Sequence, residues 1–163
     1  MCYFGCVKIA PSLAFAFVLM LTAVPASDPY SSLSQGEKEL LKPQVERWIH
    51  DQLKHDWSDL WEIQDQTPGL KSELLLGQKD APDMDRVRFV QAMRDTIGSG
   101  FPEIKAYTVT GIRHENGGFR IEGCGKLQRE NWKQTGVTNV HARIANRKVV
   151  FGLPDFTPDP CKL

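Results

Sequence analysis

The chain has 163 residues, with 20 basic and 20 acidic side chains and therefore a formal net charge of zero at neutral pH. This balance argues against nucleic-acid binding, which requires a concentrated basic face, and gives no support for electrostatic docking to a membrane. The apolar fraction of 41% and the charged fraction of 25% are ordinary for a folded globule.

The first 26 residues have the organisation of an export signal. Lys8 is the only charged side chain ahead of an apolar stretch over residues 13–21, and Val24 and Ala26 are the small residues that signal peptidase requires. We predict a signal peptide over residues 1–26, cleavage before Ser27, export to the periplasm or the exterior, and no stable membrane insertion afterwards. The alternative is an uncleaved anchor, because residues 9–26 carry no charge and just reach the length of a membrane helix.

Residues 27–163 are predicted to form a single α+β domain, because about 100 to 200 residues suit one hydrophobic core. Two cysteines remain in this segment, Cys124 and Cys161, and an oxidising compartment favours a disulfide between them. The alternative is two free buried thiols. Two cysteines alone cannot complete a zinc site, so we predict no metal and no cofactor.

The first half of the domain is predicted to be helical. Ser34 and Glu37 have the spacing of a capping box, which begins a helix, and Pro43 either bends that helix or starts a second one. His55–Asp56 marks a short break. Apolar residues recur at helical spacing on one stripe, with polar residues such as Asp51 on the other side; the stripe comprises Val45, Trp48, Ile49, Leu53, Trp57, Leu60 and Trp61.

Beyond this stripe, residues 67–69 (Thr-Pro-Gly) predict a turn, and the apolar run over residues 74–76 predicts a short strand. A later helix begins after Asp83 or Asp85 and ends at Gly98. Its apolar face carries Phe89, Val90, Met93 and Ile97.

The second half predicts an antiparallel sheet. Strands over residues 104–114 and 119–128 flank Asn116–Gly117, a strong hairpin signal, and strands over 137–145 and 149–151 flank Asn146–Arg147. Alternation places Phe119, Ile121 and Leu127 on the inner face of their strand and Cys124 on the outer face, and it places Val140, Ala142 and Ile144 on the inner face of the next. The outer face is therefore expected to meet water.

The tail over residues 153–163 contains three prolines and is expected to lie along the surface. If Cys124 and Cys161 pair, the bridge would hold this tail against the outer face of the sheet.

The order of these segments resembles the nuclear transport factor 2-like superfamily. The resemblance rests on Glu46-Arg47-Trp48, Asp56-Trp57-x-x-Leu60-Trp61, Thr67-Pro68, the short helix around Phe89 and the final meander of strands. It implies helices packed on a curved antiparallel sheet, forming a cone whose interior is an enzyme pocket, a binding pocket or core. Cystatin-like relatives share this outline, and fold alone does not carry function.

In such a cone we predict Trp57, Trp61 and Tyr107 as ligand-binding residues, because concave sites are mostly apolar. The alternative is that the tryptophans are core. For an enzyme of the ketosteroid isomerase or polyketide cyclase kind, the resemblance implies an acid and a base inside the cone, and Asp56 and Tyr107 are the only candidates. Asp56 is more simply a helix cap and Tyr107 more simply sheet packing, so no catalytic residue is assigned.

The histidines give no metal motif. His50 and His55 are five residues apart, which spoils a ligand pair at i, i+4, and both are expected to be solvated. His141 is expected on the outer face of the sheet and His114 at the hairpin rim.

The function that these patterns favour is non-enzymatic binding of a small apolar ligand or a partner protein. One alternative is a cone-type enzyme, such as an isomerase, cyclase or dehydratase, acting on a small apolar substrate. Another is that the sheet mediates homodimerisation.

Overall fold

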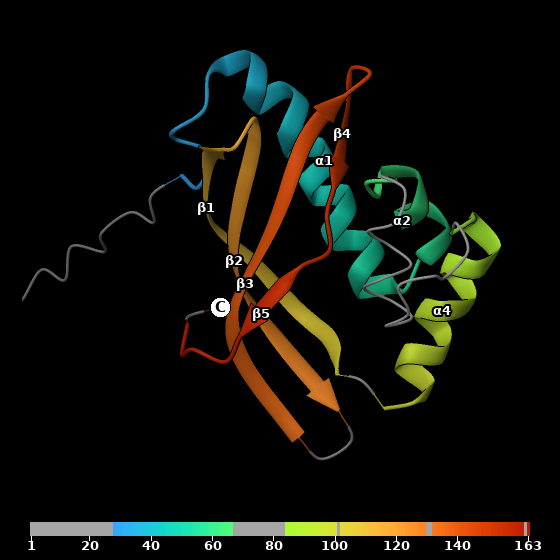
Figure 1. The fold of residues 1–163 in the computed structure, drawn as a ribbon. Helices are drawn as coiled ribbons and strands as arrows, with labels where there is room; N and C mark the ends of the chain where they lie inside the picture. Colours follow the sequence, from blue (N-terminus) through green and yellow to red (C-terminus); the bar gives the residue numbers. More distant parts are fainter. Residues whose placement is uncertain (1–27, 67–83, 101, 130–131, 162) are drawn as a thin grey trace, which may run out of the picture.

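A computed structural model describes residues 28–66, 84–100, 102–129, 132–161 and 163, and it has an α+β fold with three helices packed against an open antiparallel sheet (Figure 1). The helices are α1 (Gln35–Lys54), α2 (Trp57–Ile63) and α4 (Arg86–Gly98). The strands are β1 (Glu103–Glu115), β2 (Gly118–Arg129), β3 (Trp132–Ala145), β4 (Lys148–Phe151) and β5 (Asp155–Thr157). The turn predicted at residues 67–69 and the strand predicted at 74–76 lie outside the described residues.

The predicted capping box begins α1. The Ser34 N–H donates to the Glu37 carboxylate at 2.8 Å, and the Glu37 N–H donates to the Ser34 hydroxyl at 3.4 Å, so two amides without helical partners are satisfied. The helix continues through Pro43 as one element. It ends at His55, whose φ of 59° is left-handed, and Asp56 then caps α2 by accepting from the Asp59 N–H. The predicted break is confirmed.

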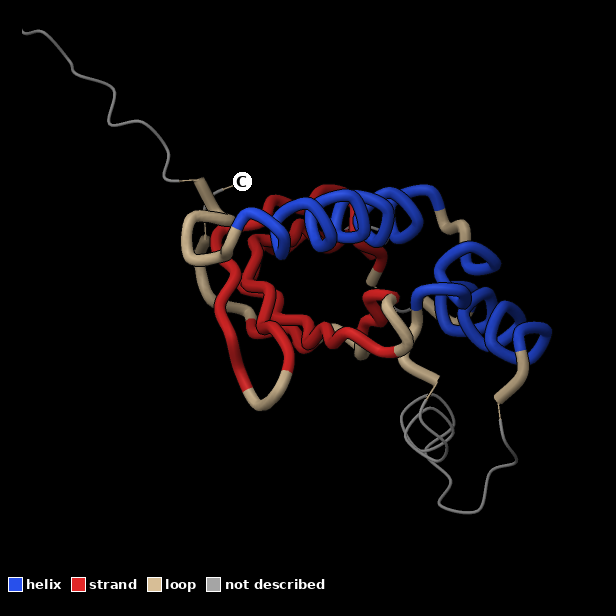
Figure 2. The backbone as a smooth tube through the Cα atoms, turned by 90° about the horizontal axis from the view of Figure 1, so that it is seen from above, coloured by secondary structure: helices blue, strands red, loops and turns tan. Residues whose placement is uncertain are grey.

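The strands run in the order β1-β2-β3-β4, and β5 also pairs with β3. Asn116 and Gly117 both have positive φ, as a type I′ hairpin turn requires, and Asn146 and Arg147 repeat this geometry at the β3–β4 turn. The third strand begins at Trp132, earlier than the predicted residue 137. Figure 2 shows the strands curving beneath α1, which lies along their inner side.

The core lies between α1 and the inner face of the sheet. Trp48 is buried, packs edge-on against Tyr107 at a ring-centroid distance of 5.4 Å, and stacks on Phe151 at 6.0 Å. Ile144 keeps the predicted alternation with Val140 and Ala142 and pairs with the buried Val149, but its side chain is 46% exposed. The pairing of β2 with β3 reaches only Phe119–Ala142, so Ile144 lies past the last paired residue of β2.

The C-terminal tail departs from the prediction in part. Residues Asp155–Thr157 form β5, with Phe156 opposite Thr138, because the extended tail meets a length of β3 that β4 leaves unpaired. The predicted disulfide is present, with the sulfurs of Cys124 and Cys161 at 2.03 Å. Cys124 is fully buried although it belongs to the outer face, so the tail covers part of the surface expected to be wet.

Of the helices in the described ranges, none is both long enough and apolar enough to cross a lipid bilayer.

Candidate functional site

A pocket of about 470 Å³ lies where the ends of several elements meet the inner face of the sheet. Its walls come from the end of α1, the start of α2, the second half of α4, the start of β1, the end of β2, the middle of β3 and the tail. A pocket of this volume is in the range of sites that hold small molecules, about 300–1,000 Å³.

Most of the lining is apolar. The apolar residues are Trp57, Met93, Ile97, Pro102, Ile104, Leu127, Leu153, Pro154 and Phe156. Phe156 reaches the pocket because β5 pairs with β3 and because position 136 is glycine: a Cβ at Gly136 would lie 2.3 Å from the Phe156 ring. The tail therefore forms one wall of the pocket rather than a loose surface segment.

His55 and Glu103 supply a polar wall. The left-handed backbone at the end of α1 turns the His55 ring onto Trp57, with the centroids 5.1 Å apart and the planes 14° apart. His55 Nε2 is 3.3 Å from Glu103 Oε2. A hydrogen bond from Lys105 lowers the pKa of Glu103, so this carboxyl is ionised at neutral pH. His55 was expected to be solvated and is so only in part, since its side chain is 35% exposed.

Two buried hydroxyl groups lie at the inner face of the sheet. Thr138 lines the pocket, is 2% exposed, and its Oγ1 has no hydrogen-bond partner in the described part of the chain. The Tyr107 hydroxyl is likewise buried without a partner there. Burial raises the pKa of Tyr107, so the phenol stays neutral and able to donate.

The three predicted ligand-binding residues occupy different places. Trp57 is in the pocket wall. Trp61 lies on α2 and packs against Phe89 of α4, with ring centroids 5.3 Å apart. Tyr107 packs behind the pocket, against Trp48. Both tryptophans lie on α2, as predicted, but Trp57 lines the pocket whereas Trp61 contacts α4.

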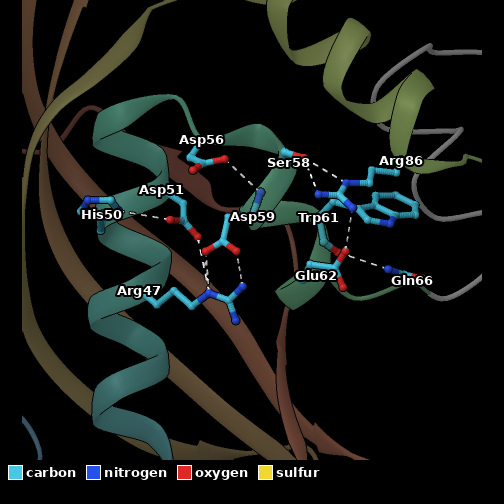
Figure 3. A network of polar contacts seen from close by, with 10 residues as sticks. All are labelled: Arg47, His50, Asp51, Asp56, Ser58, Asp59, Trp61, Glu62, Gln66 and Arg86. Carbon is cyan, nitrogen blue, oxygen red and sulfur yellow. Dashed lines mark hydrogen bonds and ion pairs between the residues drawn. The ribbon is translucent and has the colours of Figure 1, made fainter.

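A second polar cluster joins α1 to α2 (Figure 3). Arg47 Nε donates to Asp59 Oδ2 at 2.7 Å, and this bond lowers the pKa of Asp59. Asp51 is 1% exposed, and burial raises its pKa. The predicted solvent-facing position of Asp51 was wrong, because α2 folds back over this side of α1. Asp56 is an exposed cap of α2, so it cannot serve as an acid or base inside the sheet.

Several residues of the pocket carried no signal in the sequence. Thr138, Glu103 and Leu153 come together only through strand pairing and the return of the tail. His141 and His114 are exposed, as expected, and pair with Glu115 and Glu37. Across the described ranges, no three His, Cys, Asp or Glu side chains gather as a metal site.

Comparison with protein-family models and with curated protein sequences found no match. Among solved structures, the chain is similar to Bd1075 of Bdellovibrio bacteriovorus, with a TM-score of 0.52 and 12% identity over 80% of this chain and 45% of that chain. The chain thus spans less than half of that protein. It is also similar to RPA3114 of Rhodopseudomonas palustris, which contains a SEC-C motif, with a TM-score of 0.44 and 12% identity over 73% of this chain and 90% of that one. The first likeness shows the fold alone, and the second carries no argument.

Proposed function

We propose that this protein binds a small, mostly apolar molecule in the pocket at the inner face of the sheet. The observation that carries the proposal is the pocket of about 470 Å³ that apolar side chains from α2, α4, β1, β2 and the tail enclose. The chain leaves apolar surface uncovered in this concave site. Binding of an apolar ligand is favourable because it removes that surface from water.

The proposal also includes export and a cone of the nuclear transport factor 2-like kind. The signal-like pattern of residues 1–26 supports export, and the Cys124–Cys161 disulfide is compatible with an oxidising compartment. The curvature of the strands beneath α1 supports the cone (Figure 2).

A second candidate function is a cone-type enzyme with His55 as general base. The observation in its favour is the His55–Glu103 pair in the pocket wall, since a carboxylate that holds one imidazole nitrogen orients the ring for proton transfer. Replacing His55 with Gln separates the two functions. A binding protein keeps its affinity for an apolar ligand in this variant, whereas an enzyme loses turnover.

The binding proposal is tested by filling the pocket. Ile97→Trp adds an indole to the lining, and we expect the affinity for the neutral fluorescent probe N-phenyl-1-naphthylamine to fall at least about tenfold, since the added ring takes the ligand's space. The measurement is a fluorescence titration.

The matched control is Val87→Trp on the same helix, where the native side chain is 77% exposed. This variant is expected to bind the probe as the wild type does. Equal affinity in all three proteins, or no binding by the wild type, would rule out this pocket as the site.

A further inference from the structure

The unpartnered hydroxyls of Thr138 and Tyr107 both lie over the inner face of β2. A Cβ at Gly123 would be 2.3 Å from the Tyr107 oxygen, and a Cβ at Gly125 would be 2.9 Å from Thr138 Oγ1. Gly123 is the cross-strand partner of Thr138. The two hydroxyls thus occupy the space that side chains at positions 123 and 125 would take.

Buried polar groups without a hydrogen-bond partner are rare in folded proteins. Burial removes their hydrogen bonds to water, and no bond within the protein replaces them. The indole N–H of Trp48, which packs edge-on against Tyr107, is a third buried group without a partner in the described residues. Of these three groups, the Thr138 hydroxyl belongs to a residue that lines the pocket. A polar atom of a ligand would supply the missing hydrogen-bond partner.

The ligand's charge follows from the surroundings. Among the described residues, the ionisable side chains that line the pocket are His55 and Glu103, and they already pair with each other. No free charge in this part of the lining would therefore compensate a buried ion, and burial of an uncompensated ion is costly. Hydroxyl groups of threonine and neutral tyrosine both donate, and the indole N–H only donates. The polar atom that suits them is therefore a neutral acceptor.

We infer that the ligand is an uncharged apolar molecule with one acceptor oxygen, such as a ketone or ether, which accepts a hydrogen bond from the Thr138 hydroxyl. This inference rests on the proposed function of the pocket. Thr138 lines the pocket, and its hydroxyl is the group of this side chain that can donate a hydrogen bond to a ligand there.

The test uses three probes of one shape on the purified protein: naphthalene, 2-acetylnaphthalene and 2-naphthoate. We expect the ketone to bind about tenfold more tightly than the hydrocarbon, the magnitude of one net hydrogen bond, and the carboxylate to bind more weakly than either. Thr138→Val keeps the shape of the side chain and removes the donor, so it should reduce the ketone's affinity to that of naphthalene. Thr108→Val, at an exposed position of β1, is the matched control.

Folding of the variants is measured in parallel. Because the hydroxyls of Thr138 and Tyr107 have no partner in the described residues, Thr138→Val and Tyr107→Phe should unfold at the same temperature as the wild type or higher. A lower unfolding temperature for Thr138→Val would mean that the hydroxyl is already satisfied inside the protein, and would overturn the inference.

The remaining outcomes distinguish failure of the proposed function from failure of the inferred ligand class. If none of the three probes binds the wild type, the proposed function fails. If naphthalene binds as tightly as the ketone, or if Thr138→Val keeps the preference for the ketone, the pocket remains a binding site and the inferred ligand class is wrong.

Discussion

Tyr107 and Gly123 show how a single residue shapes the surface beneath α1. The Tyr107 ring lies where a side chain at position 123 would be, and a Cβ there would approach both its Cζ and its oxygen to 2.3 Å. Gly123→Ala must therefore push the ring against Trp48, its edge-on neighbour. We expect a loss of about 2 kcal/mol in the free energy of unfolding, measured by urea denaturation.

Gly98→Ala is the control for this substitution. Gly98 is the last residue of α4, and a Cβ there would meet nothing within 4 Å. Alanine also has the higher helix propensity, so this variant should be as stable as the wild type or more stable. A similar loss in both variants would contradict the assignment of the effect at position 123 to the space that Tyr107 needs.

The beginning of α1 is linked to the β1–β2 hairpin by an ion pair that responds to acid. His114 Nε2 lies 2.7 Å from Glu37 Oε1, and this contact, with the capping bonds of Ser34, lowers the pKa of Glu37 from 4.5 to about 2. Because the folded state prefers the ionised carboxyl, its contribution to stability is complete above pH 4.5 and is lost as the pH falls toward 2. The stability difference between the wild type and Glu37→Gln should therefore shrink over this interval, as thermal unfolding at a series of pH values would show.

Glu39→Gln changes the same charge on the same helix without removing the cap, since Glu39 is not part of the capping box and accepts a hydrogen bond from Gln35. Its difference from the wild type should be small throughout the interval. Because the Glu37–His114 pair is exposed, added salt should also weaken the effect of Glu37→Gln. An unchanged difference between the wild type and Glu37→Gln from pH 5 to pH 2 would contradict the assignment.

Elements whose signals are local could be predicted from the sequence. The capping box at Ser34, the break at His55–Asp56 and the Asn116–Gly117 hairpin each depend on a few consecutive residues. Asp51 is misplaced by the helical periodicity, because its burial depends on α2 folding back over α1. The candidate site could not be predicted as a unit, since its residues come from seven parts of the chain and those that belong to a recognised pattern, such as Trp57, Met93 and Leu127, belong to separate ones.

At the scale of the whole molecule, the disulfide links the stability of the fold to the shape of the pocket. Leu153, Pro154 and Phe156 form a wall, and the tail that carries them is held to β3 by the three-residue β5 and, farther along the chain, to Cys124 by Cys161. For a sequence separation of 37 residues, the chain-entropy model gives about 4 kcal/mol of stabilisation. Reduction should therefore lower the unfolding temperature and also weaken binding of an apolar probe at temperatures where the protein remains folded.

Two variants separate loss of the wall from loss of stability. Phe156→Ala keeps the bridge and removes the side chain that covers Gly136, so it should weaken binding of N-phenyl-1-naphthylamine while retaining most of the stability. The double variant Cys124→Ala/Cys161→Ala should match the reduced wild type in both properties and be insensitive to dithiothreitol. If the reduced protein binds the probe with unchanged affinity, the tail stays in place without its anchor, and pairing of β5 with β3 is then sufficient to hold the wall.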